Sequence, residues 1–481
     1  MSSPPPSSAQ GRRAFDPRLI EGPIIRSLLL LAVPIMGANI LQIGYQLIDA
    51  FWVGRIGAAG VAAVSISMPI LFVMISAGMG FAVAGSILIA QYAGARDHEM
   101  IDHVAAQTLL IVTALSILLG GAGVLLAPYL LDVMNVAPDV YDGALAFLRV
   151  CLAAMPFVFA YIMFQALLRG VGQVTVPLFI VAGTVFVNFW IDPILIFGKF
   201  GLPALGVMGA GFATMIAQGV AAAIGVGLLF SGRYGIHLRW THFRPDLAFI
   251  KRAFHLGYPA SIEQSARGLG MTVMMLLITG FGTVATASFG VGMNILNVVI
   301  VPSMGISMAT ATLIGQNIGA GNVPRAERVA HLAMLLTFGA LSFVGILAFI
   351  FARELTVFFV PHDAAVIAEG ARFIRIVSWS FGFIGLQFAL TGVLRASGDV
   401  MAAMIISLVS LWVLRFPLAF VLAERTTLGT DGLWWSFPLA NVVTVLIAAV
   451  WFRRGDWKTR RLIERTPEQD DEAAVAEQVI P

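Results

Sequence analysis

Three polar residues lie in segments that are otherwise apolar. Asp49 belongs to the run LIDAFWVG, and Asn188 and Asp192 lie four residues apart in NFWIDP, a spacing that places both on one face of a helix. A carboxylate in hydrocarbon costs about 2.5 to 3.5 kcal/mol, so such residues are usually functional. Two carboxylates and an amide could take up a proton or another cation. The structural alternative puts Asp49 in water at the outer mouth and lets Asp192 cap its helix ahead of Pro193.

A second polar pair, Glu263 and Arg267, lies in PASIEQSAR. Residues four apart on a helix can form an ion pair, so we expect a structural or gating pair, with a contact to substrate as the alternative. Pro34, Gln42 and Gln46 precede the first of the acids in its segment. The two glutamines are candidate substrate contacts, and the proline should kink its helix and free backbone carbonyls.

The segments that carry these residues are predicted to cross a membrane. Of the 481 residues, 59% are apolar and only 11% are charged, which is too few for a water-soluble surface. Apolar runs of about 20 residues, long enough to cross the hydrocarbon core, recur along the chain. They must be helices because they lack the alternation of barrel strands. We place twelve, at about 27–50, 61–90, 104–127, 144–169, 177–198, 209–230, 257–280, 290–315, 331–352, 368–394, 402–423 and 433–452.

The two halves of the chain repeat one another. Residues 34–110 align without a gap on residues 259–335, an offset of 259 − 34 = 225, with 19 of 77 positions identical. Pro34 falls on Pro259, and Gln91 falls on Gln316. Six helices per copy return the chain to its starting side, so both halves should have the same orientation. The prediction is an all-α integral membrane protein with twelve transmembrane helices in two six-helix lobes related by a direct repeat.

The candidate ion-binding residues are absent from the second copy. Asp49 aligns with Met274. Asn188 and Asp192 align with leucines at the offset of 394 − 168 = 226 that matches LRGVGQ with LRASGD. Residues needed for packing should tend to recur in both copies, whereas an ion site can be confined to one. The asymmetry favours a single ion site in the N-terminal half. Arg415 lies mid-span near Pro417 and either makes a buried polar contact or marks a helix break.

Charge and composition set the expected topology and domains. Most of the 29 Lys and Arg residues fall on the side of the N-terminus, which predicts that both termini are cytoplasmic. Dispersed basic residues and a net charge of +3 argue against nucleic-acid binding, and no Cys and His spacing indicates a metal site. The expected domains are a disordered N-terminal tail at 1–23, an N-lobe at 24–232, a basic linker along lipid headgroups at 233–256, a C-lobe at 257–455 and an acidic cytoplasmic tail at 456–481.

Over about residues 24–455 the motifs resemble those of multidrug and toxic compound extrusion (MATE) transporters. They are VGRIG in the first repeat, LIAQYAGA and LIGQNIGA ending spans two and eight, LRGVGQ and LRASGD after spans four and ten, and GAGFAT in span six. Within this family the chain resembles the DinF-like branch, which implies a cation or proton site made by Asp49, Asn188, Asp192 and Thr214. Span ten has no aspartate, a departure that argues against the sodium site of the NorM-like branch.

The resemblance implies an antiporter that exports small organic, often cationic, amphipathic compounds in exchange for protons by alternating access. We expect a monomer among the lipids of a bacterial inner membrane, with no cofactor. Sodium coupling at the same four residues and a lipid-linked saccharide flippase of the same superfamily are the alternatives. The flippase is disfavoured because the buried charge is mainly acidic. No HExxH or GxSxG motif indicates an enzyme.

Overall fold

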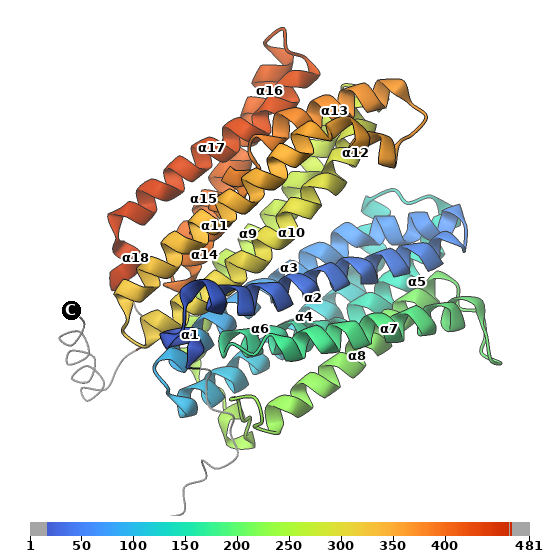
Figure 1. Cartoon of the computed structure of the whole chain (residues 1–481). Coiled ribbons are helices and arrows are strands. Elements are labelled where there is room, and N and C mark those ends of the chain that lie inside the picture. Colours follow the sequence, from blue (N-terminus) through green and yellow to red (C-terminus); the bar gives the residue numbers. More distant parts are fainter. Residues whose placement is uncertain (1–16, 461, 464–481) are drawn as a thin grey trace, which may run out of the picture. The chain divides into compact units, whose positions relative to one another are not determined.

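The computed structural model describes residues 17–460 and 462–463, and within them every regular element is a helix. The chain divides into two compact units (Figure 1). Unit 1 contains residues 37–261 together with the described residues up to Glu21. Unit 2 contains residues 22–36 and the described residues from Ile262 onward.

The helices of unit 1 pack closely because small residues lie where they meet. A Cβ on Gly78 of α3 would lie 2.8 Å from the ring of Phe159 on α6, and a Cβ on Gly225 of α8 would lie 2.7 Å from the ring of Phe164. Small residues allow such close approach between membrane helices. The helices are α1 (Arg18–Glu21), the second part of α2 (Ile24–Gly54), α3 (Ala58–Gly94), α4 (His98–Val133), α5 (Pro138–Ala153), α6 (Met155–Gly170), α7 (Thr175–Phe197), α8 (Val207–Phe230), the 3-10 helix η1 (Trp240–Phe243) and the first part of α9 (Leu247–Thr279).

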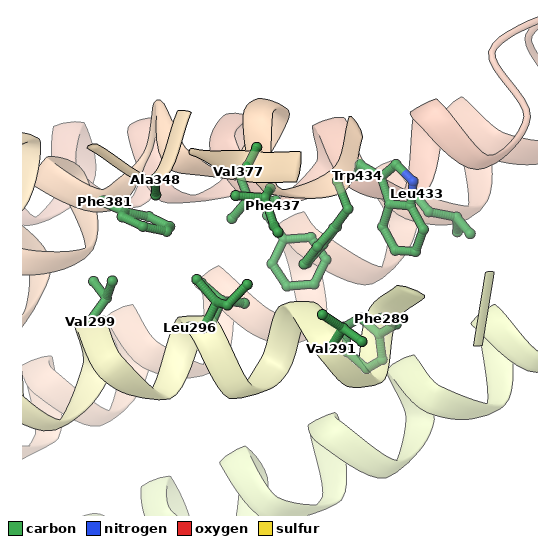
Figure 2. Packing of buried hydrophobic residues seen from close by; sticks show 14 of the residues in the cluster. Phe289, Val291, Leu296, Val299, Ala348, Val377, Phe381, Leu433, Trp434 and Phe437 are labelled. Atoms are coloured by element: carbon green, nitrogen blue, oxygen red, sulfur yellow. The ribbon is translucent and has the colours of Figure 1, made fainter. Parts of the chain in front are cut away.

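Unit 2 packs around an aromatic cluster (Figure 2). The rings of Phe373 and Trp434 lie 4.6 Å apart between centroids, and Phe289 and Phe437 complete the group. All four are nearly excluded from solvent. The helices are the first part of α2, the second part of α9, α10 (Thr283–Gly319), α11 (Val323–Ile350), α12 (Ala352–Phe359), α13 (Ala364–Ser378), α14 (Phe381–Ala396), α15 (Val400–Leu408), the π-helix η2 (Val409–Arg415), α16 (Phe416–Glu424), α17 (Thr430–Arg454) and α18 (Asp456–Thr459).

The helices account for the twelve predicted spans. In the described part of the chain, 9 spans are long and apolar enough to cross a membrane, and two bent helix pairs raise the number to 11. The remaining predicted span is α9, whose 33 residues include the polar Glu263 and Arg267. Each of these bent pairs was predicted as a single span, at 144–169 and 368–394. In the structure α5 and α6 meet at 47°, and α13 and α14 meet at 49°.

Two helices, α2 and α9, belong to both units. The division falls after Met36 on α2 and after Ser261 on α9, two residues beyond Pro34 and Pro259. These positions correspond in the repeat, because 261 − 36 = 225. Each helix runs through its proline as one helical element. Proline removes one backbone hydrogen bond, so each helix is weakened just before it passes from one unit to the other.

The linker between the halves is shorter and more tightly held than the sequence predicted. Residues 247–256 are the start of α9 rather than linker. The Gln107 side chain on α4 donates to the carbonyl oxygens of His242 and Arg244 at 2.7 and 2.6 Å, and Asp102 accepts from the backbone N–H of His237 at 2.7 Å. The segment therefore docks on α4. These buried hydrogen bonds hold its backbone whether or not its basic side chains reach lipid.

The predicted tails lie largely outside the described residues, at 1–16 and beyond Ile463. Inside them the structure shows two short helices. In α1, Leu19 is only 1% exposed, and in α18, Trp457 is also 1% exposed. The prediction of disorder is wrong for residues 18–21, because one buried apolar side chain anchors that turn.

Candidate functional site

Two helices of unit 1 bring the candidate ion-binding residues together. Tyr45 and Asp49 are four residues apart on α2, and Asn188 and Asp192 are four apart on α7, so each helix turns two polar side chains to one side. Helix α7 continues through Pro193 to Phe197. Asp192 therefore lies inside its helix, and the alternative that it caps the helix end is wrong.

Asn188 connects the two acids. Its Nδ2 donates to Asp49 Oδ1 at 2.5 Å and to Asp192 Oδ2 at 2.8 Å, while its Oδ1 accepts from the Tyr45 hydroxyl at 3.0 Å. Each polar atom of the amide thus has a chemically matched partner. Asn188 and Asp192 are 0% exposed and Tyr45 is 4% exposed. The bonds of Asn188 to Tyr45 and Asp192 are therefore buried, where hydrogen bonds are strongest, whereas its bond to Asp49 is only partly buried.

The two acids also lie close to each other. Asn188 Nδ2 lies 2.5 Å from Asp49 Oδ1 and 2.8 Å from Asp192 Oδ2, so these two oxygens are at most 2.5 + 2.8 = 5.3 Å apart. Two ionised carboxylates at this separation repel each other, so a proton on one of them or a cation beside them would stabilise the pair. Asp192 Oδ1 is buried and has no hydrogen-bond partner among the described residues. When both acids are ionised, the pair therefore lacks a proton or cation to bind its carboxylate oxygens.

Thr214, on α8, completes the set of residues that the sequence named. Its hydroxyl lies within hydrogen-bonding reach of the Tyr45 hydroxyl and of the Asp49 carboxyl. The structure thus brings all four candidates together, and their part in ion coupling stays a prediction. Tyr45 was missed. The only signal for it in the sequence is its position four residues before Asp49, on the same helix face.

The other sequence candidates on α2 do not join this group. Gln46 is exposed, and as the neighbour of Tyr45 it is turned about 100° away around the helix. Gln42 is half-buried, and in the described contacts it makes no hydrogen bond to the four residues. Pro34 belongs to unit 2. The part of the two glutamines in substrate binding, and of Pro34 in gating or substrate binding, stays a prediction.

The set of side chains at this site limits the ion it could hold. Among the described residues, no group of three or more His, Cys, Asp and Glu side chains is suited to a metal ion. The carboxylates and hydroxyls could hold a proton or a hard monovalent cation such as Na+. Asn188 turns its NH2 group, not its oxygen, toward the acids. In this orientation the amide donates to both acids and offers them no oxygen as a further cation ligand.

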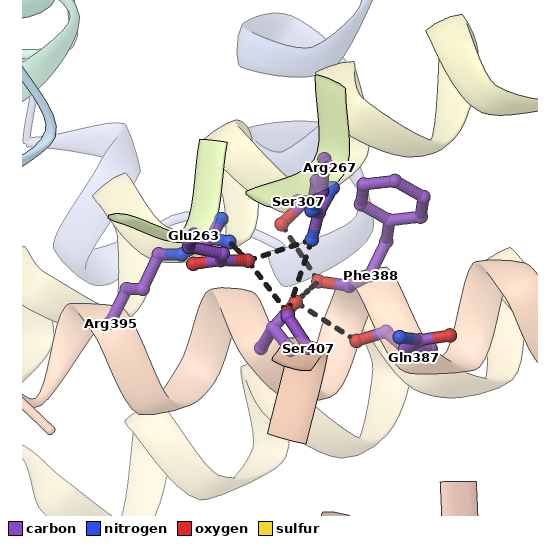
Figure 3. A network of polar contacts seen from close by, with 8 residues as sticks. Glu263, Arg267, Ser307, Gln387, Phe388, Arg395 and Ser407 are labelled. Carbon is purple, nitrogen blue, oxygen red and sulfur yellow. Dashed lines mark hydrogen bonds and ion pairs between the residues drawn. The ribbon is translucent and has the colours of Figure 1, made fainter. Parts of the chain in front are cut away.

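A second polar cluster lies in unit 2 (Figure 3). Arg267 Nη2 lies 2.7 Å from Glu263 Oε1, so the predicted pair forms on α9. Arg395 on α14 donates to the same oxygen at 2.5 Å, and the Ser407 hydroxyl on α15 donates at 2.7 Å. Glu263 is 1% exposed and connects three helices. Arg395 lies in the LRASGD motif that follows predicted span ten, where no sequence signal indicates a part in this cluster.

Arg415 adds a further, partly buried charge to unit 2. It is the last residue of η2, donates from Nη2 to Asn441 Oδ1 at 2.8 Å, and lies 4.8 Å from the ring centroid of Phe437. Both alternatives from the sequence hold, because the residue makes a polar contact and ends an irregular helical segment. The three arginines that accompany Glu263 in this unit are only partly buried. Among the described residues the charged side chains that are buried are acidic, as the sequence predicted.

Comparisons with known proteins reproduce the internal repeat. One family model, MatE, matches the chain twice, over residues 34–194 and 259–421. The two matches begin 259 − 34 = 225 residues apart, which is the offset found in the sequence, and together they cover more than half of the chain. The chain belongs to the MATE family. The predicted family and fold class are confirmed, and the protein is a multi-pass membrane transporter rather than an enzyme.

Individual MATE proteins are similar over nearly the whole chain. The probable multidrug resistance protein YoeA of Bacillus subtilis is 29% identical, over 91% of this chain and 95% of its own length. The probable multidrug resistance protein NorM of Thermotoga maritima is 28% identical, over 92% and 96%. The fold matches an outward-facing MATE transporter of the MOP superfamily with a TM-score of 0.84 at 23% identity, covering 92% of this chain and 98% of that one.

Proposed function

We propose that this MATE transporter exports small amphipathic organic compounds, cations among them, in exchange for protons by alternating access. It would act as a monomer in a bacterial inner membrane, with both termini in the cytoplasm and no cofactor. The names of its relatives, as multidrug resistance proteins, support the class of cargo. The observation that carries the proposal is the pair of the partly buried Asp49 and the buried Asp192, joined by Asn188.

The geometry favours protons over sodium as the coupling ion. A proton on either acid would remove the repulsion between the two carboxylates and leave the hydrogen bonds of Asn188 in place. A sodium ion would have to displace the amide NH2 group that now faces both acids. Turning the amide to present its oxygen would also separate that oxygen from the Tyr45 hydroxyl that donates to it. Sodium coupling at the same residues, including Thr214, is the second candidate.

Coupling requires that protonation and cargo binding exclude each other. A ligand shifts a conformational equilibrium only by its differential affinity for the two states. With both carboxylates ionised, the site carries two negative charges and attracts a cationic cargo. Protonation from outside removes that charge and weakens the attraction. Once the cargo has left, the transporter releases its protons into the cytoplasm. The acid pair is then ionised again and can bind the next cargo molecule.

Proteoliposomes containing the purified transporter test the proposal. A fluorescent amphipathic cation would be loaded, and a proton gradient and a sodium gradient would be imposed separately with the membrane potential held at zero. We expect a proton gradient alone to drive counter-directed dye movement and a sodium gradient alone to drive none. Dye movement driven by sodium alone would overturn the choice of ion. No response to either gradient, with dye binding intact, would overturn the antiport mechanism.

A further inference from the structure

The segment that follows α8 exposes a large aromatic side chain. Trp240, the first residue of η1, is 80% exposed. Its ring lies 5.3 Å from the ring of Phe230 and 5.9 Å from that of Phe243, and the two phenylalanine rings stack at 6.2 Å, all between centroids. We call these three residues the aromatic patch. Aromatic side chains gain much from burial, so an exposed tryptophan grouped with two further rings indicates a surface that contacts something outside the chain.

The backbone is held on both sides of Trp240. Before it, Leu238 is 1% exposed and donates its backbone N–H to the carbonyl oxygen of Leu229 on α8 at 3.1 Å. After it, the Gln107 side chain on α4 donates to the carbonyl oxygen of His242 at 2.7 Å. The chain is therefore folded back onto the end of α8 and tied to α4, and the fold itself keeps the tryptophan ring exposed.

The aromatic patch lies where a membrane span ends. Helix α8 is long and apolar enough to cross a membrane, and Phe230 is its last residue. Rings packed on Phe230 are therefore close to the depth of the lipid headgroups. Tryptophan is enriched at this depth, because its ring is apolar and its N–H group can donate to a polar partner. The bias of Lys and Arg predicts that this end of α8 is cytoplasmic.

Basic side chains flank the aromatic patch. Residues 231–252 contain five Lys and Arg residues and a single acidic residue, Asp246. Arg239 directly precedes η1 and Arg244 directly follows it, and both are exposed. Asp246 is already engaged, because it accepts from two backbone N–H groups at the start of α9 and pairs with His103 at 3.3 Å. An exposed aromatic surface with an excess of positive charge is complementary to anionic lipid headgroups.

We propose that the aromatic patch, together with Arg239 and Arg244, binds anionic lipids of the leaflet at this end of α8. Trp240 inserts between the lipid headgroups, and the two guanidinium groups pair with lipid phosphates. The patch thereby fastens to the membrane surface the segment that joins α8 to α9. The sequence predicted only basic side chains along headgroups, and the structure adds an aromatic insertion at a fixed position. The inference goes beyond the proposed export function and does not depend on it.

The test uses tryptophan fluorescence of the full transporter in nanodiscs of phosphatidylcholine and phosphatidylglycerol, one of which carries bromine on its acyl chains near the headgroup. Each protein is compared with its Trp240→Phe version, so that the difference reports this one of the nine tryptophans. We expect brominated phosphatidylglycerol to quench Trp240 more than brominated phosphatidylcholine does. Arg239→Gln should lower the association constant of phosphatidylglycerol about fivefold, as for one basic residue lost near an anionic surface. Arg239→Lys and the control Lys199→Gln, an exposed residue between α7 and α8, should stay within about twofold of the wild type.

Two results would overturn the inference, provided that thermal unfolding shows all variants to be folded. If aqueous iodide quenches Trp240 and neither brominated lipid does, the patch faces water and would be open to a soluble acidic partner instead. If both brominated lipids quench equally and Arg239→Gln changes nothing, the patch touches the membrane without selecting anionic lipid. Dye export driven by a proton gradient, measured on the same proteins, tests the proposed function separately, and its failure would leave the lipid result standing.

Discussion

Replacing Asp49 by asparagine separates the coupling role of the acid pair from its structural role. Asparagine has the shape of aspartate and keeps an oxygen that can accept from Asn188 Nδ2, now 2.5 Å from Asp49 Oδ1. One charge-assisted hydrogen bond becomes a neutral one, which lowers the free energy of unfolding by about 1 kcal/mol. The variant should therefore fold. What it loses is a carboxyl group that can bind and release a proton.

The size of the effect on transport follows from the number of acids at the site. Two carboxyl groups can exchange at most two protons per cycle, and each pH unit contributes about 1.36 kcal/mol per proton. With the membrane potential at zero, one pH unit can hold about a tenfold cargo gradient for one proton and a hundredfold gradient for two. Asp49→Asn removes one of the two carboxyl groups, and we expect its cargo gradient to fall to about one.

The assay is the steady-state dye gradient in proteoliposomes that contain equal amounts of folded protein. Asp139→Asn is the matched control, because this aspartate of unit 1 is exposed in the first turn of α5 and lies apart from the acid pair. The control should hold the wild-type gradient. A wild-type gradient in Asp49→Asn would refute the reasoning, since Asp192 alone would then suffice for coupling or the proton would bind elsewhere.

Four further substitutions test the polar network, the helix packing and a helix cap. Asn188→Leu leaves both acids and the tyrosine hydroxyl without their partner, so the free energy of unfolding should fall by roughly 3 kcal/mol in thermal unfolding. Gly292→Ala would place a Cβ 1.8 Å from the ring of Phe373 and should cost about 1 to 3 kcal/mol, whereas Gly290→Ala on the same helix meets no atom within 4 Å and should be neutral or stabilising. Backbone N–H groups in the first turn of α9 hold the pKa of Asp246 below its ordinary value. Asp246→Ala should therefore cost about 1 kcal/mol at neutral pH, and the difference from wild type should vanish as the pH falls through that lowered pKa.

The sequence predicted the helices well because the membrane leaves few alternatives. Each apolar run must satisfy its own backbone hydrogen bonds, so length and composition alone place the spans. The bends between α5 and α6 and between α13 and α14 were not predicted. Pro156 near the start of α6 is a local signal for the first bend, but Ser380, at the second, is not a helix breaker. The division of α2 and α9 between the units depends on contacts between distant parts of the chain, which a repeat alignment does not show.

The acid pair could be predicted because a buried carboxylate is rare and costly, and because the second half lacks it. The same reasoning failed for Tyr45 and Arg395. A tyrosine is common in membrane helices, and only the hydrogen bond from its hydroxyl to Asn188 reveals its place in the site. Arg395 follows an apolar span and has the repeat-related Arg169 as its counterpart, so it resembled an ordinary loop residue. Its partner in the structure is Glu263, and the first half has no acidic residue at the position equivalent to Glu263.

The two halves of the repeat therefore differ in their charged residues, although their helices correspond. At the offset of 225, Glu263 and Arg267 align with Ala38 and Gln42, and Asp49 aligns with Met274. Apart from Arg169 and Arg395, which correspond to each other, these charged groups of one half are absent from the other, although both halves retain the glycines and apolar residues that pack the helices. A structural requirement common to both halves would preserve the same polar residues in each. Different charged groups on equivalent scaffolds are instead what a task confined to one half requires, and the ion coupling proposed for the acid pair of unit 1 is such a task.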